Sequence, residues 1–193
     1  ITPTSGQVKI DSEQVIQFTP ANLLKAGVGR IPEDRHHDGV IGAMSVAENL
    51  AIESLDSNEI QKNGFLRRQQ LKLNAQRLSQ KYDIRGPGID APARLLSGGN
   101  IQKLILARVF EASPRLILAN QPTRGLDMGA ASEVGKRLLQ ARKRGAGVLL
   151  ISEDLDELLA LADRIIIMHD GDLHMAPSHD RAQIGLIMAG QIS

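Results

Sequence analysis

The chain has 193 residues, 42% of them hydrophobic, and no cysteine, so it can bury one substantial core and forms no disulfide bonds. Its 23 basic residues balance 22 acidic ones, and aromatic residues make up 2% of the chain, which excludes the basic, aromatic-rich surface of a nucleic-acid-binding protein. The apolar runs at 148–151 and 165–168 are far shorter than the roughly 20 residues that span a bilayer.

The first part of the chain predicts small β and α elements. Residues 7–18 alternate apolar and polar side chains around a polar centre, which is the pattern of a β-hairpin. A short helix is expected over Pro20–Ala26 and should end at Gly27. A strand is expected over Val28–Ile31, because Pro32 cannot continue it.

The middle of the chain predicts a helical unit. Apolar residues recur at helical spacing from Ser45 to about Ser79, interrupted by a polar stretch at 56–64, which indicates two or three helices. The loop Gly86-Pro87-Gly88 should close this unit. A further helix is expected to begin after Gly99 and to end before Pro114.

The remainder alternates strand and helix. Short, nearly all-apolar strands between helices are typical of a parallel sheet covered on both faces. The sequence therefore predicts an α/β fold with a mostly parallel sheet and flanking helices. The expected elements are strands at 115–119 and 147–151, helices at 130–143, 154–161 and 180–188, and a hairpin at 164–175 turning at Asp170-Gly171.

The most informative segment is Leu96-Ser97-Gly98-Gly99-Asn100-Ile101-Gln102-Lys103. A serine and two glycines precede an apolar-periodic helix, so a hydroxyl and free backbone amides at the helix N-terminus are available to an anion. The glycines have no Cβ, which lets the anion approach closely. The same residues are also common as a plain helix cap and turn, and the segment alone leaves both interpretations open.

A second segment decides between them. The apolar strand at 116–119 leads into Asn120-Gln121-Pro122-Thr123-Arg124-Gly125-Leu126-Asp127. The two segments together resemble the ABC-type ATPase domain, the first its signature and the second its Walker B region and D-loop. Ile31-Pro32-Glu33-Asp34-Arg35 resembles the Q-loop, 45–50 the opening of the helical subdomain, and 162–165 the segment after the switch loop.

Within the family, four features are most similar to the second ATPase half of tandem importers for simple sugars and nucleosides. They are the PEDR form of the Q-loop, Asn100, the PTRGLD form and the ending at 184–190. The resemblance implies four parts: a β-hairpin region with a Q-loop-like segment at 1–41, a helical subdomain at 42–96, an ATPase core with signature, Walker B-like and switch regions at 97–177, and a C-terminal helix at 178–193.

The phosphate-binding P-loop of the family is missing from this sequence. Its pattern is G-x-x-x-x-G-K-[ST], and the nearest candidate, 129–136, has the wrong spacing and falls in a predicted helix. In the family this loop lies upstream of a segment resembling 3–6, and the chain opens on Ile1 rather than Met. We therefore expect a fragment of a longer protein that binds ATP weakly by itself.

Three positions carry residues that the family does not normally place there. The resemblance puts Asn120 where an Asp binds Mg²⁺, Gln121 where a Glu polarises the attacking water, and Glu153 where a histidine donates to the γ-phosphate. Mg²⁺ favours carboxylate oxygens, an amide cannot act as a general base, and a carboxylate repels phosphate.

Each of these residues also has a structural interpretation. Asn120 and Gln121 could satisfy backbone groups at a strand end. Glu153 could stabilise the first turn of a helix, with Ser152 as its cap.

The hypothesis is a degenerate site that binds ATP with little or no hydrolysis, beside a signature that completes the ATP site of a partner domain. Asn120 is its degenerate metal position, Gln121 its degenerate base position and Glu153 its degenerate switch position. The residues expected to contact nucleotide are Ser97, Gly98, Gly99, Asn100, Gln102, Asp127 and Glu33. The expected cofactors are ATP and Mg²⁺ in the full-length protein.

The resemblance implies a peripheral subunit at the cytoplasmic face of the cell membrane. Its expected partners are a second ABC ATPase domain and membrane permease subunits, which would dock near Glu33 and the helical subdomain, with no nucleic acid. Two alternatives stay open: a soluble ABC ATPase without a transport role, and a binding module in which ATP clamps two domains together without hydrolysis.

Overall fold

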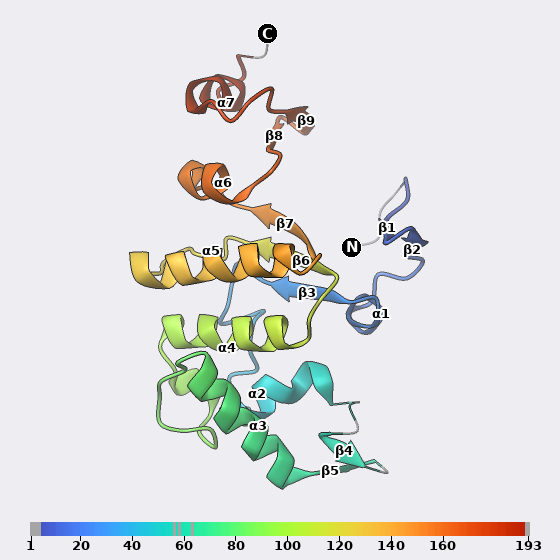
Figure 1. The fold of residues 1–193 in the computed structure, drawn as a ribbon, viewed down its shortest axis with the longest axis vertical. Helices are drawn as coiled ribbons and strands as arrows, with labels where there is room; N and C mark the ends of the chain where they lie inside the picture. The colour runs from blue at the N-terminus through green and yellow to red at the C-terminus, as the bar shows by residue number, and fades with distance from the viewer. Residues whose placement is uncertain (1–4, 56, 58, 63, 192–193) are drawn as a thin grey trace. The chain divides into compact units, whose positions relative to one another are not determined.

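The computed structural model describes residues 5–55, 57, 59–62 and 64–191 (Figure 1). These residues form two compact units that divide between Leu149 and Leu150, and each unit is described by itself. Among the residues described, none of the helices combines the length and hydrophobicity needed to cross a bilayer.

The first unit opens with the predicted hairpin. β1 (Lys9–Ile10) pairs antiparallel with β2 (Glu13–Gln14), and Asp11 and Ser12 form the turn with φ of 49° and 69°. Positive φ at both central residues matches the natural twist of paired strands. The paired strands are shorter than the alternating pattern at 7–18 predicted.

The predicted helix after the hairpin is also confirmed. α1 (Pro20–Lys25) starts after Thr19, whose side chain accepts a hydrogen bond from Asn22 N, and it has proline in its first turn. Gly27, with φ of 80°, ends it in the left-handed conformation that glycine adopts without strain.

The core sheet has three strands, β3 (Val28–Ile31), β6 (Leu116–Asn120) and β7 (Gly147–Ile151), in the order β3-β6-β7. β3 and β6 are parallel, and the register pairs Ile31 with Ala119. Ile31 and Ile117 are completely buried. The predicted parallel pairing is thus confirmed, and it places the ends of β3 and β6 side by side.

The expected coverage of both sheet faces is wrong for β7. Leu149 and Ile151 are 53% and 54% exposed, although the apolar run predicted a buried strand. β7 is an edge strand of the sheet, as is the mostly buried β3, and the exposed residues of β7 alternate along it, so they share one face. An all-apolar run reports that a strand is hydrophobic and does not report which elements cover it.

Two helices carry much of the core beside the sheet. α4 (Gly98–Glu111) packs against β3 and against α5 (Met128–Lys143) (Figure 1). The inward residues of α4 have no exposed surface; they are Ile101, Leu104, Ile105, Ala107 and Val109. Their helical spacing was the signal that predicted this helix.

The predicted helical unit is built from α2 (Val46–Ala51), a 3₁₀ turn (Ile52–Ser54) and α3 (Arg68–Lys81). Ser45 and Glu48 form a reciprocal capping box that starts α2. Asn49 is completely buried, and its side chain bonds Ile41 N at 2.8 Å and Ile41 O at 3.0 Å. The side-chain amide of Asn49 therefore satisfies backbone hydrogen-bonding groups in the segment that leads into α2.

The polar stretch between these helices contains a hairpin that the sequence did not predict. β4 (Gln61–Lys62) pairs antiparallel with β5 (Phe65–Leu66). Each strand is two residues long, and the polar residues around them show no alternation like that at 7–18. A last 3₁₀ turn (Ala93–Leu95) leads into α4.

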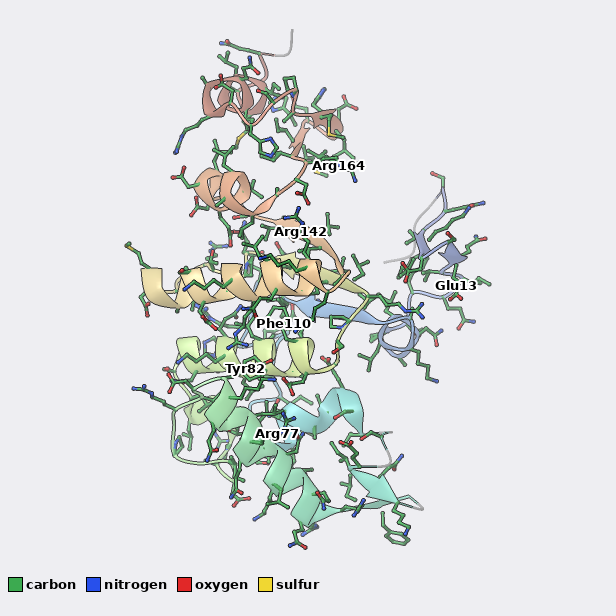
Figure 2. The ribbon with its side chains drawn as sticks, in the orientation of Figure 1. Glu13, Arg77, Tyr82, Phe110, Arg142 and Arg164 are labelled. Carbon is green, nitrogen blue, oxygen red and sulfur yellow. The ribbon has the colours of Figure 1, made fainter. Side chains whose placement is uncertain are left out.

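A polar cluster joins the end of α3 to the end of α4. Glu111 accepts hydrogen bonds from Lys81 Nζ at 2.6 Å, Arg77 Nη1 at 3.0 Å and Tyr82 Oη at 3.0 Å. Figure 2 shows Arg77 and Tyr82 along this contact. Burial, with the nearby Glu111 carboxylate, raises the pKa of Tyr82 to about 12, and the guanidinium of Arg137 stacks over its ring at 4.2 Å.

The second unit contains α6 (Leu155–Leu161), the hairpin β8 (Ile166–His169) and β9 (Asp172–Met175), and α7 (Arg181–Met188). Its small core is formed by Ile165, Ile167 and Ile184. Asp170, with φ of 47°, and Gly171 make the predicted turn. The predicted helix, hairpin and final helix are all confirmed, with their starts shifted by one or two residues.

Candidate functional site

The candidate site begins at the carboxyl ends of β3 and β6. Because neighbouring parallel strands end at the same edge of a sheet, residues that follow them come together. Glu33 lies two residues beyond β3, and Asn120 is the last residue of β6. Asn120 Nδ2 lies 3.5 Å from Glu33 Oε2, so the structure brings these two predicted site residues into contact.

Gln121 follows in a strained conformation. Its φ is 49°, in the left-handed region that residues with a Cβ seldom adopt. Such strain persists where the surrounding structure requires it, and it concentrates at functional sites. Three residues further on, Arg124 forms an ion pair with Glu33. Sequence reasoning had not singled out Arg124, although it lies inside the PTRGLD segment.

The donors at this strand end do not fit an Mg²⁺ site. The Glu33 carboxylate, which contacts Asn120, is paired with Arg124, and Asn120 and Gln121 offer amides in place of the carboxylates that Mg²⁺ favours. Across the residues that the structure describes, no group of three or more His, Cys, Asp or Glu side chains could hold a metal ion.

The signature segment opens α4 as predicted. Ser97 is the N-cap and is exposed, and its hydroxyl makes no capping bond to the amides of the first turn. A Cβ added to Gly99 would meet no atom within 4 Å. The amides of a helix's first turn have no partner within the helix and carry a positive partial charge, so this end can accept an anion.

Two other predicted nucleotide contacts use their amides inside the chain. Asn100 Nδ2 donates to Ser97 Oγ at 2.9 Å, and its Oδ1 accepts from Arg85 N at 2.7 Å. Gln102 is 3% exposed, and its Nε2 donates to Pro122 O at 2.7 Å. Gln102 therefore ties the signature helix to the turn after β6, a role that its sequence position did not indicate.

Arg35 is a neighbour of the signature that sequence reasoning missed. A Cβ added to Gly98 would lie 3.5 Å from Arg35 Nε, and one added to Gly125 would lie 3.0 Å from Arg35 Nη2. The guanidinium therefore lies beside both glycines. The available signal was the basic residue that closes the PEDR segment.

Asp34 shapes the turn that carries this arginine. Its Oδ1 accepts from His37 N at 2.9 Å and from His36 N at 3.0 Å. These backbone bonds, the one from His37 foremost, lower the pKa of Asp34. The carboxylate thus fixes the path of the chain between β3 and the signature.

Asp127 has a structural task at the start of α5. It is the N-cap of this helix, and its Oδ1 accepts from Ala130 N at 2.9 Å. The carboxylate also interacts favourably with the positive end of the helix dipole. This bond accounts for the position of Asp127, and a nucleotide contact there stays a prediction.

Glu153 lies in the second unit, exposed, between β7 and α6. The expected cap of the following helix is corrected: Asp154 rather than Ser152 is the N-cap of α6, and its carboxylate accepts from Asp156 N and Glu157 N. Ser152 Oγ accepts from Asp154 N at 3.0 Å. Asp154 caps better here because its carboxylate reaches two amides of the first turn.

Comparisons with known proteins show the family of the chain. The ABC transporter family matches residues 1–124. This chain belongs to the ABC transporter family. It is 40% identical to the nucleoside import ATP-binding protein NupA of Lactococcus lactis subsp. cremoris over 189 residues, which are 96% of the chain and 37% of that protein.

A second relative and a solved structure are also similar to this ABC domain. It is 39% identical to the glucose import ATP-binding protein TsgD13 of Haloferax volcanii, over 98% of the chain and 35% of that protein. The chain thus spans about a third of the length of these relatives. Its fold is similar to the ATP-binding cassette MJ0796 in a dimeric post-hydrolysis state with ADP and Pi, with a TM-score of 0.71, 21% identity, and coverage of 91% of this chain and 75% of that one.

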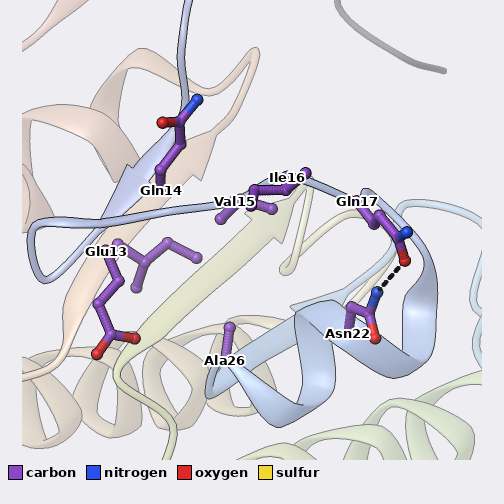
Figure 3. A pocket seen from close by; sticks show the side chains of 8 residues that line it. Glu13, Gln14, Val15, Ile16, Gln17, Asn22 and Ala26 are labelled. Carbon is purple, nitrogen blue, oxygen red and sulfur yellow. Dashed lines mark hydrogen bonds between the residues drawn. The ribbon is translucent and has the colours of Figure 1, made fainter.

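One pocket of the ABC domain lies apart from these residues. A hollow of about 330 Å³ lies between the hairpin β1–β2 and α1, where Asn22 Nδ2 donates to Gln17 Oε1 (Figure 3). Its lining side chains are apolar or amide apart from Glu13, and they include no cation. This pocket therefore offers no countercharge to a phosphate group.

Proposed function

We propose that the chain is the ATP-binding part of an importer for simple sugars or nucleosides, in which the two capacities of an ABC domain are separated. Its signature completes the ATP site of a second ATPase domain, while its own strand-end site hydrolyses little or no ATP. The observation that carries the proposal is the combination of an exposed Ser97 and an unobstructed Gly99 at the start of α4 with amides at Asn120 and Gln121.

The chemistry of the strand end supports the loss of hydrolysis. Family members use ATP with Mg²⁺, and the residues present here do not fit the metal. Gln121 can orient water through its carbonyl oxygen, but its amide cannot take a proton from that water. We expect a large loss of rate with a small loss of nucleotide affinity at this site.

The signature keeps what a partner's nucleotide requires. A bound ATP would supply a terminal phosphate carrying negative charge. Ser97 offers a hydroxyl, Gly99 leaves space in front of the amides of the first turn of α4, and the Arg35 guanidinium lies beside Gly98. These groups would hold the phosphate through hydrogen bonds and would transfer no proton. They can therefore serve a hydrolysis that the other domain catalyses.

The proposed partners follow from the relatives, whose names describe import. We place the whole protein at the cytoplasmic face of a membrane, bound to permease subunits through the region of Glu33 and the helical unit at 42–96. The sugar or nucleoside that is carried is recognised by those subunits in this proposal.

The proposal is tested by Ser97→Arg in the complete protein with its membrane subunits, measured as ATP hydrolysis. A bulky cation at the signature should reduce turnover by more than roughly tenfold, because it fills the space of the phosphate. The control is Ser5→Arg, the same change at an exposed position of the N-terminal segment. Equal activities of the two variants would overturn the proposal.

A further inference from the structure

The amide of Asn100 has one possible orientation. Its Oδ1 lies 2.7 Å from Arg85 N, and a backbone N–H can only donate, so the carbonyl oxygen must face it. The NH₂ group therefore faces Ser97 Oγ, 2.9 Å away. A flipped amide would set two donors against each other at Arg85.

This orientation decides what the Ser97 hydroxyl can do. A serine oxygen carries one proton and two lone pairs, and here one lone pair accepts from Asn100 Nδ2. Ser97 is not used as a side-chain cap, and among the described residues no acceptor takes its proton. The O–H is left to donate to an anion arriving at the start of α4.

We propose that Asn100 is a positioning residue that keeps the Ser97 hydroxyl as a donor for the phosphate of the partner's nucleotide. The inference rests on the function proposed above. It assigns Asn100 a role through Ser97 instead of a direct contact with nucleotide. A neutral amide suits this task. A carboxylate at the same place would accept a hydrogen bond from the Ser97 hydroxyl and would repel the phosphate.

The support for Asn100 is itself anchored on both sides. Lys103 Nζ donates to Asp83 O at 2.9 Å and to Asp83 Oδ2 at 2.8 Å, and Arg85 Nε donates to Asp83 Oδ1 at 2.8 Å. These bonds hold the segment that follows α3 against the first turns of α4. The Arg85 amide therefore stays in place to orient Asn100.

A double-mutant cycle tests the positioning role. Ser97→Ala, Asn100→Ala and the combined variant are compared in the complete protein by kcat and KM for MgATP hydrolysis. Ser97→Ala should lower kcat/KM by roughly 10- to 100-fold, the effect of losing a hydrogen bond to a charged group. Asn100→Ala should cause a smaller loss, and the combined variant should match Ser97→Ala within about twofold.

The outcomes separate the two proposals. Full activity of Ser97→Ala overturns the proposed function together with this inference. A loss in Ser97→Ala with a multiplicative further loss in the combined variant overturns the role of Asn100 alone. Such a further loss is also what a purely structural role of Asn100 would give, since damage to the helix would persist without the hydroxyl.

Reversing the hydrogen bond gives a second test. In Asn100→Asp the carboxylate still accepts a hydrogen bond from Arg85 N, but it also accepts one from the Ser97 hydroxyl. The loss of kcat/KM should therefore exceed that of Asn100→Ala. The control is Asn74→Asp on α3, which adds the same charge where the side chain accepts from Arg77 Nη2 at 2.9 Å. Activity of Asn100→Asp equal to that of this control would overturn the inference.

Discussion

Glu33 and Arg124, 91 residues apart in the sequence, form an ion pair at the carboxyl ends of β3 and β6. The pair joins the segment that follows β3 to the segment that follows β6. Glu33 also contacts Asn120, so the carboxylate is shared by a cation and an amide. A carboxylate engaged in this way is poorly placed to serve a metal ion.

Breaking this pair should change stability little. Glu33 and Arg124 keep 44% and 60% of their side-chain surfaces exposed, and exposed ion pairs contribute less than about 1 kcal/mol. We expect Arg124→Ala to lower the free energy of unfolding, measured by urea denaturation, by no more than that. A loss of several kcal/mol would mean that the pair supports the fold rather than the site.

Glu111 should contribute more, because its side chain is 22% exposed and accepts three hydrogen bonds. We expect Glu111→Gln to lower the free energy of unfolding by about 1–2 kcal/mol, since Lys81, Arg77 and Tyr82 lose a charged acceptor. The control is Asp90→Asn, which breaks the exposed pair with Lys72. Equal losses in both variants would contradict the central place given to Glu111.

Asp83 gives a pH dependence. Hydrogen bonds from Lys103 and then Arg85 lower the pKa of Asp83 from 3.8 to about 2. A depressed folded-state pKa contributes stability above the unfolded value, and that contribution is lost as pH falls through the folded value. The stability difference between the chain and Asp83→Asn should be constant above about pH 5 and should shrink between pH 3.8 and about 2.

Denaturation curves at a series of pH values measure this difference. Urea unfolding of both proteins from pH 7 down to pH 3 is sufficient, because the decline begins near the unfolded pKa. A difference that grows as pH falls would contradict the assignment of the carboxylate as the stabilising form.

Asp127 gives a test of helix capping. Asp127→Ala should lower the free energy of unfolding by about 1 kcal/mol, since the first turn of α5 loses its side-chain acceptor. Asp127→Asn keeps an acceptor and should stay within a few tenths of a kcal/mol. If both variants lose the same stability, the bond from Ala130 N is not what holds this residue in place.

Local patterns predicted most of the fold. The hairpin turn at Asp11-Ser12, the end of α1 at Gly27 and the apolar rows of α4 follow from turn chemistry and periodicity, and the structure confirms them. The hairpin β4–β5 was missed because it lies in a largely polar stretch, without the alternation that marked the hairpin at 7–18. The exposure of β7 was missed because the apolar sequence of a strand does not show which elements pack over its faces.

The sequence located the residues proposed for the candidate site but not the hydrogen bonds that connect them. Motif spacing located Asn120, Gln121 and the signature, and parallel pairing brings Glu33 to Asn120. The bond from Arg85 N to Asn100 and the inward tie of Gln102 depend on loops that reach across the fold. A sequence read along one chain does not reveal such tertiary contacts.

The most direct test of the separated capacities is nucleotide trapping by vanadate in the complete protein with both ATPase domains. The account predicts trapping in one site, abolished by Ser97→Arg and unchanged by Gln121→Ala. The first variant blocks the phosphate of the partner's nucleotide, whereas the second alters a site that does not hydrolyse. Trapping in both sites, or loss of trapping in Gln121→Ala with retention in Ser97→Arg, would contradict the account.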